Sequence, residues 1–264
     1  MAEDMPSKEI QTASAPGGST TDSKGRITVA LVLTATVDPG ITPRVTRTDA
    51  ETRYSDYRKA ALMWSRKSSE FDRMLVLENS AHPLASRIND GLPRVELHHS
   101  GLESAGRNRG KGYGEAEMLE KLDQLLERKP ASYVLKCTGR LYCRNITSLL
   151  RVITRRPDVV IRLSRSLDYA DSRLILVRRE LLTTLVGGLK DEIDDVSGRY
   201  IEHSLARRAL KMAADGYHIA SWPAPPFFSG QSASTGERYD SASRWLTRPL
   251  RLLAYKLSRI YPYV

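Results

Sequence analysis

Short apolar segments that end in clusters of polar residues constrain the fold of this chain more than any other feature. The first spans 27–33 and is almost continuously apolar and rich in β-branched residues. Segments of this length and composition are typical of strands that a sheet buries on both faces. Further strands are predicted at 74–77, 95–97, 133–138, 158–162 and 173–177.

Helical patterns lie between several of these strands. The clearest spans 115–128, where Met118, Leu122 and Leu125 follow helical spacing and charged residues lie opposite them. Short apolar strands that alternate with helices are typical of an α/β domain with a mainly parallel sheet flanked by helices. Helices are also predicted at 49–68, 178–189 and 200–214, and one broad face of the first is predicted to carry Tyr54, Tyr57, Ala61, Leu62 and Trp64. The glycine-rich stretch 98–114 is predicted to be a loop.

Composition divides the chain into three parts. Residues 1–25 are rich in Ser, Thr, Gly, Pro and Ala, which predicts a disordered tail, and residues 26–240 are predicted to form one globular domain. Residues 241–264 carry five basic residues and no acidic one, with leucines along one helical face. We expect a basic amphipathic C-terminal helix that binds an anionic membrane surface. A helix docked on the domain or at a homodimer interface is the alternative.

Charge and cysteine content narrow the partners and the compartment. The chain has 41 Lys and Arg against 31 Asp and Glu, and this net charge of +10 attracts nucleic acid, anionic membranes or phosphorylated small molecules. Nucleic acid is not expected, because no known binding motif is present and only 7% of residues are aromatic. Two cysteines, no apolar run of about 18 residues and no secretory signal predict a cytoplasmic protein.

Polar clusters follow three of the predicted strands. They are Thr34-Ala-Thr36, Glu78-Asn79-Ser80 and Lys136-Cys-Thr138-Gly-Arg140. Ligands of parallel sheets bind beyond the carboxyl ends of the strands. Hydroxyl and carboxylate groups there can hold a nucleoside, and the basic side chains, with Arg53 on the first helix, can pair with phosphate. The alternative for the first cluster is a capped turn with surface arginines, and for the second a loop entry in which Asn79 and Ser80 form local turn bonds. For the third it is an edge strand whose charged groups lie in water.

The segment 107–115 combines glycines with Lys111 and Tyr113 just before a predicted helix. Free backbone N–H groups and a helix N-terminus favour phosphate. The sequence is neither a Walker A motif nor a dinucleotide fingerprint, so a flexible surface loop is the alternative. The segment 225–236 consists mainly of small and polar residues, and this composition is typical of either a lid over a ligand or a linker.

Candidate acid–base residues lie in the last third of the domain. Glu202 can act as a general base that accepts the proton of an acceptor hydroxyl, and His203 is the second candidate. Asp168 and Asp171 form an acidic pair that can bind a cation or a hydroxyl, and Asp171-Ser-Arg173 precedes a predicted strand. A solvated surface is the alternative for this pair. His98, His99, Cys137 and Cys143 do not have the spacing of metal ligands.

Seven motifs follow one another along the chain. They are Thr34-Ala-Thr36, Arg53-x-x-x-Tyr57, Glu78-Asn-Ser80, Gly110-Lys-Gly-Tyr-Gly-Glu115, Lys136-x-Thr-Gly-Arg140, Asp171-Ser-Arg173 and Tyr200-Ile-Glu202. This ordered series resembles bacterial glycosyltransferases of capsule and lipopolysaccharide O-antigen gene clusters, over roughly residues 27–240. The resemblance implies a GT-A-like fold with a Rossmann-type sheet.

The resemblance also implies partners and roles. The donor would be a nucleotide-sugar such as a UDP-sugar, and the acceptor a hydroxyl of a polysaccharide or lipid-linked glycan at the inner face of the cell membrane. Transfer would proceed with inversion. Glu202 and Asp171 would be catalytic. Substrate-binding roles would fall to Thr34, Thr36, Arg53, Glu78, Asn79, Lys111, Tyr113, Lys136, Thr138, Arg140 and Arg173.

The sequence departs from that family at the usual metal site. No Asp-x-Asp motif ends the strand at 133–138, where Lys136 and Arg140 stand instead. We therefore expect no cofactor, with fixed cations neutralising the diphosphate. Metal ligands supplied by Asp168 and Asp171 are the alternative. A non-catalytic protein that binds nucleic acid, or a membrane-associated scaffold, is the alternative function.

Overall fold

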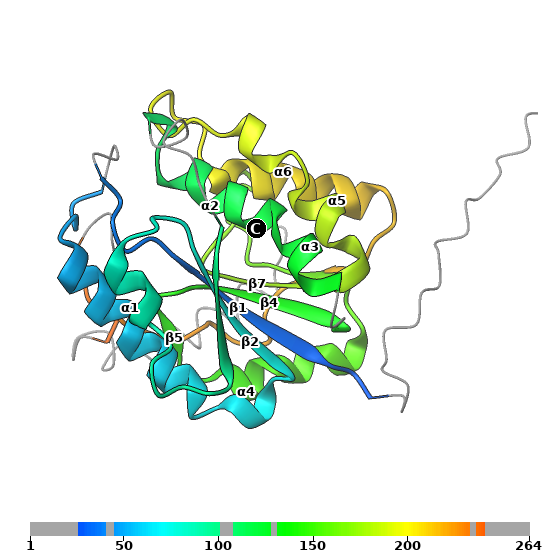
Figure 1. Ribbon diagram of the computed structural model, residues 1–264. Coiled ribbons are helices and arrows are strands. Elements are labelled where there is room, and N and C mark those ends of the chain that lie inside the picture. The colour runs from blue at the N-terminus through cyan, green and yellow to red at the C-terminus, as the bar shows by residue number, and fades with distance from the viewer. Residues whose placement is uncertain (1–25, 41–44, 101–107, 128–130, 233–235, 241–264) are drawn as a thin grey trace, which may run out of the picture.

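A seven-stranded sheet with helices on both faces forms the centre of the molecule (Figure 1). The computed structural model describes residues 26–40, 45–100, 108–127, 131–232 and 236–240. In spatial order the strands are β3 (Val95–His99), β2 (Arg73–Glu78), β1 (Val29–Ala35), β4 (Tyr133–Thr138), β7 (Leu174–Arg178), β6 (Val159–Val160) and β8 (Ile219–Ala220). A separate two-stranded sheet pairs β5 (Tyr142–Cys143) with β9 (Phe228–Ser229).

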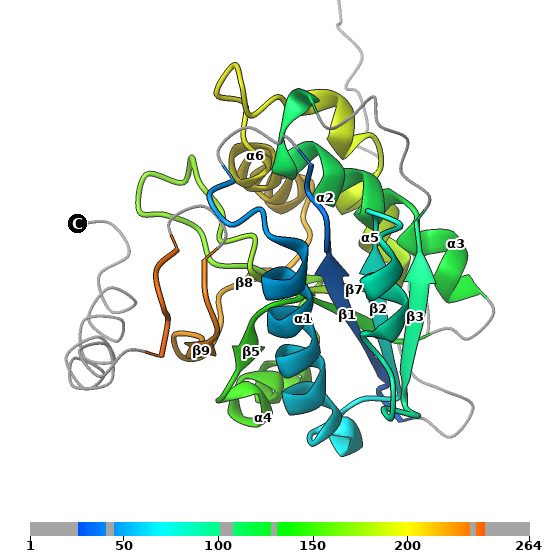
Figure 2. The ribbon, with the colours of Figure 1, turned by 60° about the vertical axis from the view of Figure 1, so that its left-hand side comes forward.

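The helices form two layers, one on each face of the sheet (Figures 1 and 2). One layer contains α1 (Ala50–Ser65) and α4 (Ile146–Leu149). The other contains α2 (Lys111–Glu120), α3 (Leu122–Glu127), α5 (Leu182–Val186) and α6 (Ile201–Ala214). Short 3₁₀ helices lie at Ser68–Glu70, Pro83–Arg87, Leu150–Arg155, Arg179–Leu181 and Leu189–Glu192.

Strand direction confirms the predicted α/β class with a mainly parallel, Rossmann-type sheet. β1 is parallel to β2 and to β4, and β3 is parallel to β2. β7 is the exception, because it runs antiparallel to both β4 and β6. A hairpin-like connection with a bridge between Leu163 and Ala170 joins β6 to β7. Such a connection, without a crossover helix, returns the chain in the opposite direction.

The core lies on both faces of β1, where every residue is buried. Leu31 and Leu33 pack in the cluster that includes Trp64 of α1. Ala30 and Val32 pack in the cluster on the opposite face, under α2, α5 and α6. Burial on both faces explains why this strand is almost continuously apolar in sequence instead of alternating.

The first helix begins close to the predicted residue and ends earlier. Asp49 caps it by accepting a hydrogen bond from the Thr52 backbone N–H at 2.7 Å. Tyr57 and Trp64 face the core as predicted, and the Trp64 indole N–H donates to the Leu141 carbonyl at 2.9 Å. Leu62 was predicted on the same face but is 42% exposed, because it lies beyond the edge of the buried stripe.

Two predicted helices differ from those observed. The helix expected at 115–128 begins at Lys111 and is divided into α2 and α3, so the glycines at 112 and 114 are helical and not in a loop. The helix expected at 178–189 is a 3₁₀ turn followed by the short α5, which ends before Gly187 and Gly188. Tertiary contacts at 110–112, described below, override the low helix propensity of glycine.

The predicted tail at 1–25 and the predicted C-terminal helix at 241–264 lie outside the described residues. Their structure and membrane role therefore stay predictions. Within the described ranges, none of the helices is both long enough and apolar enough to cross a membrane.

Candidate functional site

Three of the predicted polar clusters meet at one edge of the sheet, because β2, β1 and β4 are adjacent and parallel. The backbone N–H of Gly139 donates to the carbonyl of Thr34 at 2.9 Å. A Cβ atom added at Gly139 would lie 2.5 Å from that carbonyl oxygen. Only glycine therefore permits this close approach of the two strand ends.

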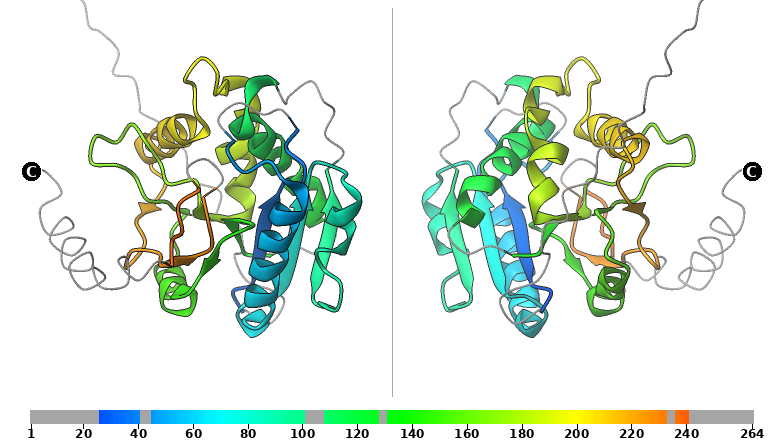
Figure 3. Two further views of the ribbon diagram at one scale, coloured as in Figure 1. Left: turned by 90° about the vertical axis from the view of Figure 1, so that its left-hand side faces the viewer. Right: turned by 90° about the vertical axis from the view of Figure 1, so that its right-hand side faces the viewer.

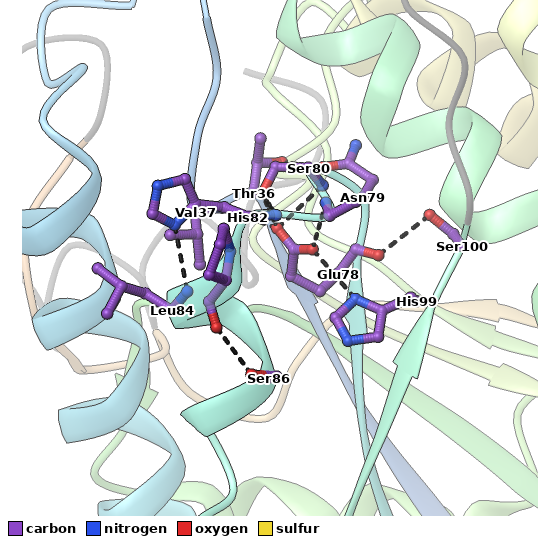
Figure 4. A network of polar contacts seen from close by, with 12 residues as sticks. Thr36, Val37, Glu78, Asn79, Ser80, His82, Leu84, Ser86, His99 and Ser100 are labelled. Atoms are coloured by element: carbon purple, nitrogen blue, oxygen red, sulfur yellow. Dashed lines mark hydrogen bonds and ion pairs between the residues drawn. The ribbon is translucent and has the colours of Figure 1, made fainter.

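Glu78 lies at the centre of a polar network (Figure 4) and is fully buried. Its carboxylate accepts hydrogen bonds from the backbone N–H groups of Val37, Ser80 and Ala81 at 3.0, 2.9 and 3.1 Å. Nδ1 of His99 lies 3.4 Å from the same carboxylate. These bonds fix the turns after β1 and β2, while the predicted contact of Glu78 with a nucleoside stays a prediction.

Thr36 and Asn79 connect the two turns to α2. The Thr36 hydroxyl donates to Oδ1 of Asn79 at 2.6 Å, and the Asn79 amide donates to the Gly114 carbonyl at 3.4 Å. Asn79 is buried and Thr36 is half-buried. Thr36 and Asn79, which belong to two of the predicted polar clusters, are thus in contact, and Thr36 is the more accessible of the two to a ligand.

Arg53 is buried behind this edge and not exposed at it. Its guanidinium donates to the carbonyl of Thr36 at 2.7 Å, to the carbonyl of Arg47 at 3.1 Å and to the Tyr57 hydroxyl at 3.0 Å. These bonds hold the chain after β1 against α1. Phosphate binding by Arg53 stays a prediction, and the observed contacts are structural.

A buried ion pair joins Lys136 of β4 to Glu115 of α2, with side chains that are 5% and 12% exposed. The Lys136 ammonium also donates to the Ser172 carbonyl, and the Thr34 hydroxyl donates to Glu115 at 3.2 Å. Burial alone would raise the pKa of Glu115, but the charge and hydrogen bond of Lys136, together with the charges of Lys111 and Arg140, outweigh it and the pKa is lowered. Lys136 is therefore neutralised inside the protein.

Glu202, in the first turn of α6, continues this chain of contacts. Its carboxylate accepts a hydrogen bond from the hydroxyl of the buried Ser172 at 2.9 Å. Burial raises the pKa of Glu202, with a further contribution from Glu115, and Lys111 opposes the shift. A carboxylate with a raised pKa is suited to accept a proton near neutral pH. Thr34, Glu115, Lys136, Ser172 and Glu202 thus form one polar chain across the sheet edge.

Asp171 and Arg173 form a bidentate pair beside Ser172. Nε and Nη2 of Arg173 lie 2.7 and 2.6 Å from the two carboxylate oxygens. Burial would raise the pKa of Asp171, but the bonds and charge of Arg173 lower it. The same guanidinium lies over the rings of Phe228 and Tyr239, at 4.9 and 5.2 Å from their centroids. The pair thereby joins the 170s to β9, and the catalytic role of Asp171 stays a prediction.

The N-terminus of α2 is capped by a carboxylate of the protein. The Gly112 N–H donates to Oδ2 of the buried Asp195 at 2.9 Å. Gly110 has a φ of +105°, and a Cβ atom there would lie 2.5 Å from Cβ of Asp195. This contact explains the two glycines as packing requirements. Lys111 itself is exposed.

The remaining predicted binding residues lie around the same edge. The Arg109 guanidinium lies 4.7 Å above the Tyr113 ring, and the half-buried Arg140 donates to the Gln231 carbonyl at 2.9 Å. The backbone N–H of Thr138 donates to the Arg173 carbonyl at 3.0 Å, which brings the ends of β4 and the 170s together. The binding roles of these residues stay predictions.

Sequence reasoning did not assign roles to three residues of this site. Glu115 ended a quoted motif, Ser172 lay inside another, and Asp195 belonged to an acidic run. Helical spacing placed Glu115 on α2, but nothing in the sequence paired it with Lys136. Across the described segments, no group of three or more His, Cys, Asp or Glu side chains is arranged to hold a metal ion.

No model of a protein family matches the chain, and no curated protein matches it. Similar solved structures include a candidate nucleotide-diphospho-sugar transferase from Desulfovibrio desulfuricans G20, with 11% identity, a TM-score of 0.48, and coverage of 73% of this chain and 78% of that one. HddC from Yersinia pseudotuberculosis has 11% identity, a TM-score of 0.44, and coverage of 76% and 92%. A 4-diphosphocytidyl-2C-methyl-D-erythritol synthase has 10% identity, a TM-score of 0.45, and coverage of 85% and 98%. Likeness at this level carries no argument about activity.

Proposed function

We propose that the protein is a glycosyltransferase that moves a sugar from a nucleotide-diphosphate donor to an acceptor hydroxyl. The observation that carries the proposal is the buried polar chain from Thr34 to Glu202 at the carboxyl ends of parallel strands. Ligands of such sheets bind at this edge. This series of polar contacts ends at the carboxylate of Glu202, whose pKa is raised.

The proposed reaction is a direct displacement at the anomeric carbon of the donor. A bond forms between the acceptor oxygen and that carbon, and the bond from that carbon to the diphosphate breaks. The acceptor proton passes to Glu202, and the electron pair leaves with the nucleoside diphosphate. One displacement of this kind inverts the configuration of the anomeric carbon.

Fixed cations at the sheet edge would stabilise the leaving diphosphate. Arg140 follows the end of β4 and Lys111 begins α2, and the positive charges of both lower the pKa of Glu115. Lys136 is the least suited of the predicted cations, because Glu115 neutralises it. We therefore assign the diphosphate to Arg140 and Lys111, with Lys136 positioning Ser172 and Glu115, and we propose that no metal is required.

The acceptor and location are finer parts of the proposal. A polysaccharide or lipid-linked glycan acceptor rests on the resemblance of the motif series. Attachment to the inner face of the cell membrane rests on the basic composition of residues 241–264. Homodimer formation through the same segment is the alternative use of its apolar face.

Thermal unfolding in the presence of nucleotide-sugars tests the proposal. Saturation at about a hundred times Kd should stabilise the fold by about 2.7 kcal/mol. The panel should include UDP-, GDP-, CMP- and dTDP-sugars, with free sugars as the control for nonspecific effects. Stabilisation by at least one nucleotide-sugar and turnover with it would support the proposal. A protein that none of them stabilises, and that plain DNA or RNA shifts in a salt-sensitive gel assay, would contradict it.

A further inference from the structure

We propose that Tyr169, His203 and Tyr200 form a platform that binds one face of an acceptor pyranose beside Glu202. This inference rests on the proposed glycosyltransferase activity and specifies the class of acceptor that the same site takes. The three residues come from the connection between β6 and β7 and from the start of α6.

Three rings are in contact at the N-terminal end of α6. The centroids of Tyr169 and His203 are 5.7 Å apart with nearly perpendicular planes, and those of Tyr200 and His203 are 5.5 Å apart. Figure 3 shows the yellow-green connection 163–170 on the same side of the molecule as α6. The Ala170 N–H donates to the Glu202 carbonyl at 3.0 Å, which fixes the connection against the first turn of the helix.

Tyr169 presents an aromatic surface to solvent. It is one of only four large apolar or aromatic residues that are exposed among the described residues, and 43% of its surface is accessible. Burial raises the pKa of Tyr169 to about 12, with contributions from Glu202 and Asp171. The exposed aromatic ring of Tyr169 therefore lies near Glu202, the candidate base.

A second pair of rings contacts Arg173 of the Asp171–Arg173 pair. Phe228 and Tyr239 have centroids 6.1 Å apart, and Arg173 lies over both. Tyr239 also contributes to the raised pKa of Tyr169. Aromatic residues make up only 7% of the chain, yet several of them lie close to Glu202 and Asp171.

This combination of groups suits a pyranose. A pyranose has an apolar C–H face, which packs on an aromatic ring, and an edge of hydroxyls, which require hydrogen-bonding partners. His203 and the carboxylate of Glu202 supply such partners next to the rings. A hydroxyl held over this platform would lie beside the group proposed to deprotonate it.

The charges near Tyr169 favour a neutral ligand over a nucleotide. Asp168 adjoins Tyr169 in sequence and accepts hydrogen bonds from the hydroxyls of Ser166 and Ser164, and these bonds lower the pKa of Asp168. Glu202 lies beside the same connection, because its carbonyl accepts the hydrogen bond of the Ala170 N–H. A base stacked on Tyr169 would bring its phosphates toward these carboxylates, which repel them.

Saturation-transfer NMR on the full chain tests the platform with a panel of methyl α- and β-hexopyranosides, in the presence of UDP. For at least one sugar, the C–H protons of one ring face should receive the strongest saturation. Tyr169→Ala should weaken binding of that sugar about tenfold, and Tyr169→Phe should retain it. Tyr54→Ala, a half-buried tyrosine on α1, is the matched control and should bind like the unmodified protein.

The inference is overturned if no pyranoside of the panel is saturated, or if Tyr169→Ala binds as well as Tyr169→Phe. It is also overturned if UMP, and no pyranoside, depends on Tyr169. The nucleotide-sugar experiment separates the two proposals. Donor binding without pyranoside binding removes the platform and leaves the proposed activity, whereas pyranoside binding without donor binding removes the activity.

Discussion

The pKa values of two half-buried carboxylates of the site are shifted in opposite directions. Glu115 and Glu202 both lose solvent, which favours the protonated acid. Glu115 contacts the Lys136 ammonium directly, so its carboxylate stays charged. Glu202 accepts a bond from the neutral Ser172 hydroxyl, and the effect of burial wins. Environments that push the pKa values of two carboxyl groups apart are typical of acid–base sites, and we propose a structural role for Glu115 and an acid–base role for Glu202.

Substitution of Glu202 by Gln separates these roles. We expect Glu202→Gln to lower sugar transfer by about 10²- to 10⁴-fold, the contribution typical of a general base. The folded protein should not lose stability. Because the pKa of Glu202 is raised by folding, its ionised form disfavours the fold, and this cost is absent below the ordinary carboxyl pKa and complete above the raised value. The melting temperature at pH 8 should therefore stay the same or rise.

Asp168→Asn is the matched control for Glu202→Gln, since Asp168 is an exposed carboxylate in the adjoining connection. It should retain transfer activity within a few-fold. Transfer by Glu202→Gln at a rate near that of the unmodified protein would remove Glu202 from the proposed role.

The buried ion pair gives a second prediction. Glu115→Gln leaves the Lys136 ammonium without its carboxylate, and we expect the free energy of unfolding to fall by about 3–5 kcal/mol in urea titrations. The double variant Glu115→Gln with Lys136→Met should recover much of this loss. Because the pKa of Glu115 is lowered, its stabilising contribution is present above the ordinary carboxyl pKa and is lost as pH falls through the lowered value. A single variant as stable as the unmodified protein would contradict the pairing.

At the scale of elements, α2 determines which side chains reach the sheet edge. It begins at Lys111, earlier than its apolar pattern predicts, and the early turn places Glu115 against β4. The buried Asp195 fixes this start from a distant segment. A negatively charged group at a helix N-terminus satisfies free N–H groups and the helix dipole.

Asp195→Ala should therefore destabilise the protein by about 1–2 kcal/mol through the start of α2. Thermal unfolding measures the loss, and hydrogen exchange should locate it at the amides of residues 112–115. Asp191→Ala, which removes an exposed carboxylate from the same acidic run, is the control and should change stability by less than about 0.5 kcal/mol. Equal losses in both variants would show that the cap is not specific.

At the scale of the whole molecule, one edge of the sheet gathers residues from most of the chain. Thr34 is the first and Glu202 the last of the five site residues in the sequence, and contacts through Glu115, Lys136 and Ser172 connect them. The parallel strands β1 and β4 end at this edge, and the antiparallel β7 begins there, which brings Ser172 to the same place. Cations at this edge, and not metal ligands, are expected to balance the donor diphosphate.

Transfer activity should accordingly survive chelation. We expect full turnover in EDTA and no more than a small stimulation when Mg²⁺ or Mn²⁺ is added. Arg140→Met should lower kcat/KM for the nucleotide-sugar by about tenfold or more, because a cation close to phosphate is lost. Activity that disappears in EDTA and returns with Mn²⁺ would overturn metal independence.

The sequence alone determined the fold class, most strand positions and the gathering of polar clusters at one edge. Strands buried on both faces must be apolar throughout, and turns need small polar residues, so these features are local. The antiparallel direction of β7 was not predictable, because hydrophobic pattern does not record strand direction. The early start of α2 was missed for a related reason: glycine disfavours helices unless distant residues stabilise them.

Only the tertiary structure decided what each polar residue of the site does. Glu78 and Arg53 read as ligand-binding residues in the sequence, yet their bonds go to backbone groups of neighbouring turns. Lys136 was predicted to pair with phosphate, and folding supplies it with the carboxylate of Glu115. Residue type fixes which bonds a side chain can make, whereas burial and the partners brought close by folding fix which of them it does make.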